Sequence, residues 1–192
     1  NKNAYGRYVV QDQQNCKRLA SIFNGNLVLE KTNLRFKSWL KTLNIQSLEK
    51  KGRLQLDNAW LSGFIDAEGC FSTRLRKDSE YKLNFRVDRG FIINQKGELT
   101  LFSILKKLFK SNAKIQKTIK KNSIYYKLEL KSIESTQLLL NYLEQFPCQG
   151  EKKSSVRTYR LISGYMRRKE HLTEKGLQKI RRLCKKKQSP IS

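Results

Sequence analysis

Two carboxylates stand at the end of an apolar stretch, where acidic side chains could bind a divalent cation. Asp66 and Glu68 close the segment from Leu61 to Gly69, in a protein of 192 residues with a net charge of +25. We expect a helix that ends at Gly69 in the left-handed conformation. The helix dipole disfavours a carboxylate in the last turn, so a cation bound at Glu68 would offset that cost and organise a phosphate group. The alternative is a core helix whose acidic end is only hydrated.

The same helix carries a row of small residues. We expect its N-cap at Asp57 or Asn58. Ala59, Gly63 and Ala67 then recur every four residues and form one stripe, while large apolar residues cover the other faces. This pattern predicts a helix that is buried all round and touches another helix through its small side chains.

The elements that follow are predicted from their hydrophobic periods. The expected strands are Cys70–Arg76, Lys82–Gln95, Lys114–Ile119 and Ser123–Leu130, and the expected helices are Glu98–Phe109, Ile133–Gln145, Ser154–Arg167 and Thr173–Lys186, the last one capped by Thr173. The order αββαββα with trailing helices indicates an α+β fold in which all helices lie on one face of a four-stranded antiparallel sheet. The other face is then open to a nucleic-acid duplex.

Alternation in the strands separates an apolar face from a basic and polar one. The inward positions are Phe71, Thr73, Leu75, Leu83, Phe85 and Val87. The outward candidates for nucleic-acid binding are Ser72, Arg74, Arg76, Lys82, Asn84, Arg86, Lys114, Gln116 and Lys127. Such side chains bond both phosphates and base edges. An ordinary solvated sheet face is the alternative.

Composition points to the same partner. The chain has 41 Lys and Arg against 16 Asp and Glu, and the basic residues recur throughout, so the folded surface must be cationic. A membrane surface fits less well, because no long amphipathic helix stands out. The four cysteines lack metal-binding spacing and the single histidine cannot complete a zinc site. We expect reduced thiols and an intracellular or organellar compartment.

The string Leu-Ser-Gly-Phe-Ile-Asp-Ala-Glu-Gly at positions 61–69 resembles the LAGLIDADG motif of homing endonucleases and intron maturases. The resemblance extends from Leu56 to about Lys186 and implies a saddle-shaped sheet. It further implies that the motif helices of two repeats pack together through their small residues. Glu68 would bind the divalent metal ions, Mg²⁺ in our expectation, that cleave DNA. Asp66 would be structural and bond near the helix end.

Two further catalytic candidates follow from this resemblance. Gln95 matches a glutamine after the second strand that arranges solvent or metal at the scissile phosphate, although it could equally cap the next helix. Lys152 matches a basic residue near the cleavage centre, where a cation stabilises charge developing on phosphorus. The neighbouring Lys153 and Glu151 leave that register open by one residue. His171 is better explained by packing or capping than by catalysis.

The first fifty residues depart from the family pattern. A strand at Tyr8–Val10, a helix through Leu19 and Phe23 and a helix through Phe36 and Leu40 form a weak internal repeat with the second half of the chain. We therefore expect residues 1–50 to be the remnant of a first LAGLIDADG repeat, with its linker, and residues 51–192 to be a complete repeat. The chain then has one metal-binding acid where the mechanism needs two.

Three functions follow. The first is a site-specific DNA endonuclease that regains two carboxylates as a homodimer or with a separately encoded first half. The second is a non-catalytic RNA-binding protein of an organellar ribosome or intron ribonucleoprotein, and the third is a regulatory DNA-binding protein. The intact Glu68 favours the first, whereas the missing motif, the charge and the basic end at Lys185 to Lys187 favour the second. We expect an organelle, the mitochondrion before the plastid.

Overall fold

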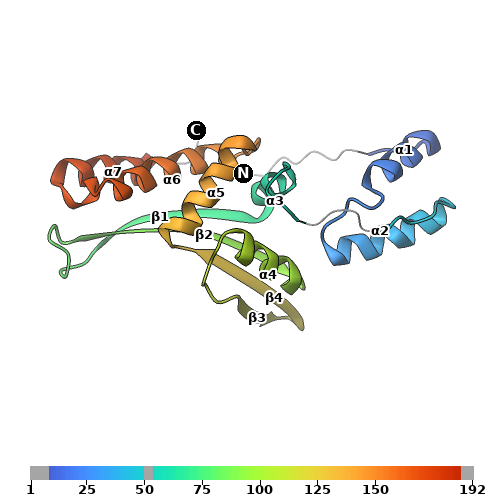
Figure 1. Cartoon of the computed structure of the whole chain (residues 1–192), viewed down its shortest axis with the longest axis horizontal. Helices are drawn as coiled ribbons and strands as arrows, with labels where there is room; N and C mark the ends of the chain where they lie inside the picture. Colours follow the sequence, from blue (N-terminus) through green and yellow to red (C-terminus); the bar gives the residue numbers. More distant parts are fainter. Residues whose placement is uncertain (1–8, 50–53, 187–192) are drawn as a thin grey trace. The chain divides into compact units, whose positions relative to one another are not determined.

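The computed structural model describes residues 9–49 and 54–186, with side chains up to Cys184. The chain forms two compact units, residues 1–54 and residues 55–192. We call them the N-terminal and the C-terminal unit and describe each by itself (Figure 1). Lys187, at the end of the expected basic tail, lies outside the described residues.

The elements agree closely with the periodic patterns. The helices are α1 (Gln13–Phe23), α2 (Glu30–Thr42), α3 (Trp60–Glu68), α4 (Leu99–Leu108), α5 (Ile133–Gln145), α6 (Lys152–Arg167), the short 3-10 helix η1 (Glu170–Leu172) and α7 (Glu174–Lys186). The strands are β1 (Gly69–Lys77), β2 (Phe85–Lys96), β3 (Gln116–Lys120) and β4 (Ser123–Leu130). The predicted αββαββα order is confirmed, and Thr173 accepts the Gly176 N–H at the start of α7 at 3.1 Å.

Two strands begin later than predicted. β2 starts at Phe85, so Lys82 and Asn84 lie in the loop between β1 and β2, where Asn84 has a φ of 55° that does not continue a strand. β3 starts at Gln116, so Lys114 lies in the preceding loop. The predicted alternation of side chains is correct within the strands. Both strands are shorter than predicted, because the residues before Phe85 and Gln116 belong to loops.

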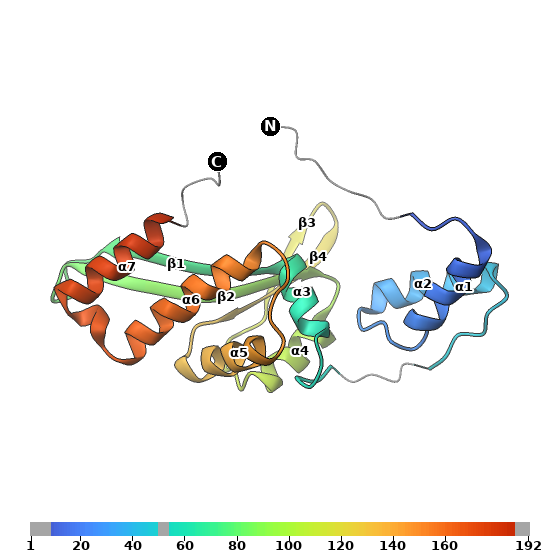
Figure 2. The ribbon, with the colours of Figure 1, turned by 90° about the horizontal axis from the view of Figure 1, so that it is seen from above.

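The four strands form one antiparallel sheet in the order β1-β2-β4-β3. In the register, Phe71 lies opposite Phe91, and Phe91 lies opposite Leu130. Helices α3, α5, α6 and α7 lie over the face that carries these residues (Figures 1 and 2). The opposite face, here called the outer face, carries exposed polar side chains such as Arg74 and Asn94.

The core of the C-terminal unit lies between the sheet and these helices. The Phe71 ring packs against the Phe91 ring at 4.9 Å and against the Tyr159 ring of α6 at 5.2 Å between centroids. Each such side chain contributes about 1.5–3 kcal/mol when it is fully buried. At the far end of the β1–β2 hairpin, Val87 packs with residues of α6 and α7. The hairpin is therefore held on its helix face along its length.

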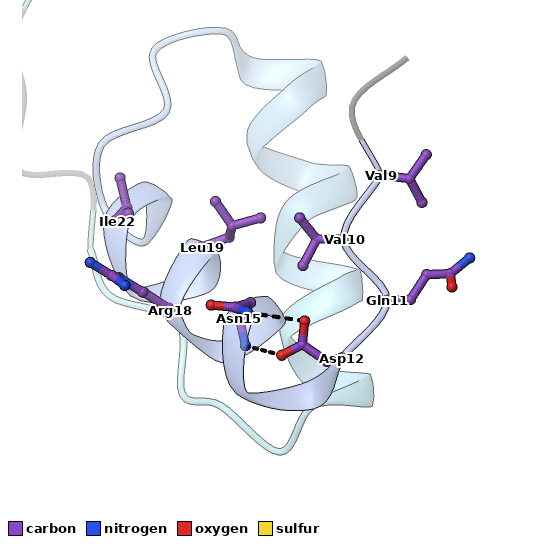
Figure 3. A pocket seen from close by; sticks show the side chains of 8 residues that line it. All are labelled: Val9, Val10, Gln11, Asp12, Asn15, Arg18, Leu19 and Ile22. Atoms are coloured by element: carbon purple, nitrogen blue, oxygen red, sulfur yellow. Dashed lines mark hydrogen bonds between the residues drawn. The ribbon is translucent and has the colours of Figure 1, made fainter.

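The N-terminal unit is a pair of helices with a small core of its own. Asp12 caps α1 by accepting the Asn15 N–H at 2.8 Å, beside a surface pocket that Val10 and Leu19 also line (Figure 3). The side chain of Asn24 bonds the backbone of the segment after α2 through two contacts of 2.8 Å. Both predicted helices are present. The predicted strand is not, since Val9 and Val10 adopt no strand and Tyr8 lies outside the described residues.

Candidate metal site and nucleic-acid interface

The N-terminal end of α3 is held by a side chain from a distant helix. Asn58 accepts the Trp60 N–H at 3.0 Å, and the Tyr142 hydroxyl accepts the Ser62 N–H at 2.8 Å while donating to the Asn58 carbonyl at 2.8 Å. The N-cap is Ala59, one residue after Asn58, and it makes no side-chain cap bond, so the predicted cap at Asp57 or Asn58 is wrong by at least one residue. Burial raises the pKa of Tyr142, which keeps its hydroxyl protonated and able to donate. No local pattern predicts this role of Tyr142, because Tyr142 lies eighty residues from its partner Ser62.

The C-terminal end of α3 is held by the loop before α6. The Asp66 carboxylate accepts the N–H groups of Gln149 at 2.7 Å and Gly150 at 3.1 Å. The Lys152 ammonium donates to the carbonyls of Asp66 at 2.8 Å and Ala67 at 3.1 Å. These carbonyls belong to the end where the helix dipole is negative, so the lysine satisfies both hydrogen bonding and charge. Asp66 thus has the structural position expected for it.

Cys148 completes this packing. Its thiol is buried, and its pKa is raised by burial and by the nearby Asp66 carboxylate. The thiol is therefore neutral and forms part of the packing of the loop against α3.

Gly69 has a different role from the one predicted. Its φ is −74°, so the chain passes from α3 into β1 without a left-handed residue. A Cβ at this position would lie 2.8 Å from the Ile65 carbonyl oxygen and 3.0 Å from the Phe91 ring. Glycine is required here because helix and sheet approach closely, and not because of its backbone conformation.

The stripe of small residues is exposed, so the prediction of a helix buried all round is wrong. Leu61, Phe64 and Ile65 are buried, whereas Ala59, Gly63 and Ala67 face outward, and a Cβ built on Gly63 meets nothing within 4 Å. Among the described residues of the C-terminal unit, no other helix covers this stripe. Contact of the stripe with a second helix stays a prediction.

The three catalytic candidates lie around one end of α3. Glu68 is the exposed last residue of the helix, and Lys152 bonds the carbonyl just before it. Gly69 pairs with Ile93, which places Gln95 at the end of β2 that lies beside Glu68. Gln95 is half-buried and accepts the Lys96 N–H at 3.0 Å. His171, in contrast, lies in η1, which packs against α6 and α7.

This end of α3 supplies one exposed carboxylate to a cation. Among the described residues there is no group of three or more histidine, cysteine, aspartate or glutamate side chains that could hold a metal ion. The described residues alone therefore do not provide the set of oxygen ligands that a bound Mg²⁺ requires.

Six of the nine predicted nucleic-acid contacts lie on the outer face of the sheet. These are Ser72, Arg74, Arg76, Arg86, Gln116 and Lys127. The other three, Lys82, Asn84 and Lys114, lie in loops. Two acids on the same face, Asp88 and Glu129, were not predicted, although alternation from Arg86 and Lys127 places both outward. Asp88 bonds Arg76 and Arg86, and Glu129 lies near Lys127 and Lys131.

None of the helices in the described part of the chain combines the length and apolarity of a membrane span.

Comparison with known proteins defines the class. The family model described as LAGLIDADG endonuclease matches residues 61–163, which is more than half of the chain. This chain belongs to the LAGLIDADG endonuclease family. The match begins at α3 and contains the sheet, α4, α5 and most of α6.

Two curated relatives are longer proteins. A probable intron-encoded endonuclease 4 from Neurospora crassa is 30% identical over 169 residues, which cover 81% of this chain and 29% of the relative. An uncharacterized 37.2 kDa protein of cox1 intron-2 from Schizosaccharomyces pombe is 29% identical over 151 residues, 77% of this chain and 42% of the relative. The chain thus matches less than half the length of either protein.

Two solved structures share the fold. The homing endonuclease I-TnaI is 26% identical with a TM-score of 0.62, over 73% of this chain and 92% of that one. The meganuclease I-SmaMI, bound to uncleaveable DNA, is 34% identical with a TM-score of 0.56, over 66% of this chain and 43% of that one. The match to I-TnaI covers nearly all of that chain.

Proposed function

We propose that this chain is one half of a site-specific DNA endonuclease, which binds duplex DNA on the outer face of its sheet. In this proposal it hydrolyses a phosphodiester when a second LAGLIDADG helix pairs with α3. The observation that carries the proposal is the exposed stripe of Ala59, Gly63 and Ala67 on the helix that ends in the exposed Glu68. Exposed small residues allow two helix backbones to approach closely, and the approach would bring a second acid beside Glu68.

The paired form would have the second metal-binding carboxylate that hydrolysis needs. Glu68 and the acid of the second helix would be the protein ligands of Mg²⁺, which as a Lewis acid would supply an activated water for phosphodiester hydrolysis. Lys152 would contribute a fixed positive charge at the same helix end, since its ammonium is held there by two carbonyls. Gln95 would orient water at the scissile phosphate.

The second helix could come from a second copy of this chain, from a separately encoded first half, or from another part of a longer protein. The relatives extend far beyond the region that matches this chain, which supports the last two sources. We propose that residues 1–50 are the remnant of a first repeat, because α1 and α2 follow one another as α5 and α6 do. The helices α1 and α2 do not include a second motif.

Cleavage as a function of association tests the proposal. The purified chain is sized and incubated with duplex DNA carrying the intron insertion site, in Mg²⁺, across a range of protein concentrations. Cleavage should follow the paired fraction, and Glu68→Gln should abolish cleavage while DNA binding persists. The matched control is Glu80→Gln, which removes an exposed carboxylate from the β1–β2 loop. Cleavage by a purely monomeric fraction would contradict the need for a second motif.

An RNA-binding role without cleavage is the second candidate. The net charge of +25 favours it, since such a surface binds any polyanion whether or not the site is complete. In this case the chain would bind a structured organellar RNA as a monomer, and Glu68→Gln would have no effect on function. Under either candidate we propose an organellar location, the mitochondrion first, consistent with a relative from a cox1 intron.

A further inference from the structure

Two arginines on the outer face share one carboxylate. Arg76 of β1 and Arg86 of β2 lie directly opposite each other in the sheet. The Asp88 carboxylate lies 2.8 Å from Arg76 Nε through one oxygen and 2.9 Å from Arg86 Nε through the other. Like charges that face each other across two strands are destabilising, so Asp88 offsets a repulsion that the register creates.

The geometry leaves the ends of both guanidinium groups available. The Arg76 and Arg86 side chains are 62% and 53% exposed, whereas that of Asp88 is 26% exposed. Asp88 occupies the Nε side of each arginine and restrains the plane of the group. The terminal nitrogens form a fork of N–H donors that matches two acceptors at once.

Asp88, Arg76 and Arg86 form a triad, whose charge balance differs from that of a phosphate-binding site. One carboxylate against two guanidinium groups leaves a net charge of +1, which weakens attraction to phosphate but keeps the donors. Guanine presents two neighbouring acceptors, O6 and N7, in the major groove, and an arginine fork bonds both. The other acid of this face, Glu129, lies 3.8 Å from Lys127 and 3.1 Å from Lys131, and lysine is a point charge without a fork.

We propose that Asp88 is a positioning residue, which holds Arg76 and Arg86 so that each reads a guanine in the bound duplex. The inference rests on the proposed function, in that it needs the outer face to bind DNA. In this proposal Asp88, Arg76 and Arg86 discriminate between DNA sequences. The other basic residues of the outer face attract DNA of any sequence.

Selection from a random-sequence DNA duplex library tests the inference at one fixed salt concentration. Wild-type protein should enrich guanine at two positions. Asp88→Asn should reduce that enrichment about fivefold or more, the discrimination of one bidentate contact, while affinity for the unselected library stays equal or rises. Arg76→Lys should keep affinity and lose the preference at one position. The matched control Glu129→Gln should leave both guanine preferences intact.

The possible outcomes distinguish failure of the role inferred for Asp88 from failure of the proposed DNA binding. If wild-type protein binds no duplex, the proposed function fails and the inference fails with it. If it binds duplexes but enriches no guanine, or if Asp88→Asn enriches guanine as strongly as wild type, the inference is wrong and DNA binding stands. Denaturation curves for each variant confirm that the binding data come from folded protein, and Asp88→Ser takes the place of Asp88→Asn if that variant does not fold.

Discussion

Two acids that are two residues apart in the sequence have opposite environments in the structure. Asp66 is turned into the loop before α6 and accepts two backbone N–H groups, whereas Glu68 is exposed at the helix end. The LAGLIDADG resemblance predicted this division, because the string of residues itself carries it. It could not predict Tyr142, whose contacts with α3 depend on how α5 crosses the helix. The sequence predicts the role of a residue that belongs to a local motif. It does not predict a role that depends on a partner far away in the sequence.

The hydroxyl of Tyr142 gives the first prediction. Tyr142→Phe leaves the Ser62 N–H and the Asn58 carbonyl without this partner inside the protein. We expect a loss of about 1–3 kcal/mol in the free energy of unfolding, the cost of leaving buried polar groups unsatisfied. Urea denaturation measures it, with Tyr81→Phe in the exposed β1–β2 loop as the control. Equal midpoints for the two variants would mean that the cap contributes nothing to stability.

At the scale of elements, hydrophobic periodicity and capping residues were sufficient to predict most of the helices and strands. α5 and β4 have the predicted ends, since Ser132 caps α5 and the alternation of β4 is regular. The errors come from close packing and turns, which no single segment encodes. Gly69 was assigned a left-handed cap because helices often end so, but the chain here enters β1 directly. α3 was predicted to be buried all round, because an apolar helix with a small-residue stripe does not reveal which molecule covers the stripe.

Gly63 gives a prediction in which stability and assembly change in opposite directions. Gly63→Leu should stabilise the isolated chain by about 0.5–1 kcal/mol, because leucine favours helix over glycine and the site is open. The same side chain should prevent close pairing of α3 with a second motif helix. Sedimentation velocity and denaturation measure the two effects, with Gly63→Ala as a control that keeps the residue small. Unchanged association of Gly63→Leu would remove the stripe from the interface.

The sheet gives a prediction about affinity. Arg74→Ala should weaken duplex binding by about 1–3 kcal/mol if its side chain contacts a base, because Arg74 is exposed on the outer face. Fluorescence anisotropy at constant salt measures the loss. Lys175→Ala, on the exposed surface of α7, is the charge-matched control. If both variants lose equal affinity, the outer face has no special part in binding.

At the scale of the whole molecule, the proposed function combines a cationic binding surface with a metal site to which the described residues contribute one acid of the motif, Glu68. The basic residues are distributed over the whole sequence, so the cationic charge does not depend on any one of them. In the proposed function, the site would combine the exposed Glu68 with an acid from a second helix, and the described residues contain no second motif of this kind. Composition and pattern predict the cationic surface, whereas no pattern in the described residues predicts the source of a second acid.

The last prediction separates these two properties by removing metal. In EDTA the chain should bind duplex DNA as before, because its surface displaces counterions from the phosphates without any metal ion. The logarithm of the affinity should fall linearly with the logarithm of the salt concentration, with a slope steeper than about −4 for a surface that contacts several phosphates. Cleavage by the paired form should stop in EDTA and return when Mg²⁺ is added, since the proposed hydrolysis needs the metal that Glu68 and the second acid would hold. Titrations in a series of salt concentrations, with and without EDTA, measure both. Binding that needed Mg²⁺, or that hardly changed with salt, would place the affinity in the metal site instead of the basic face of the sheet.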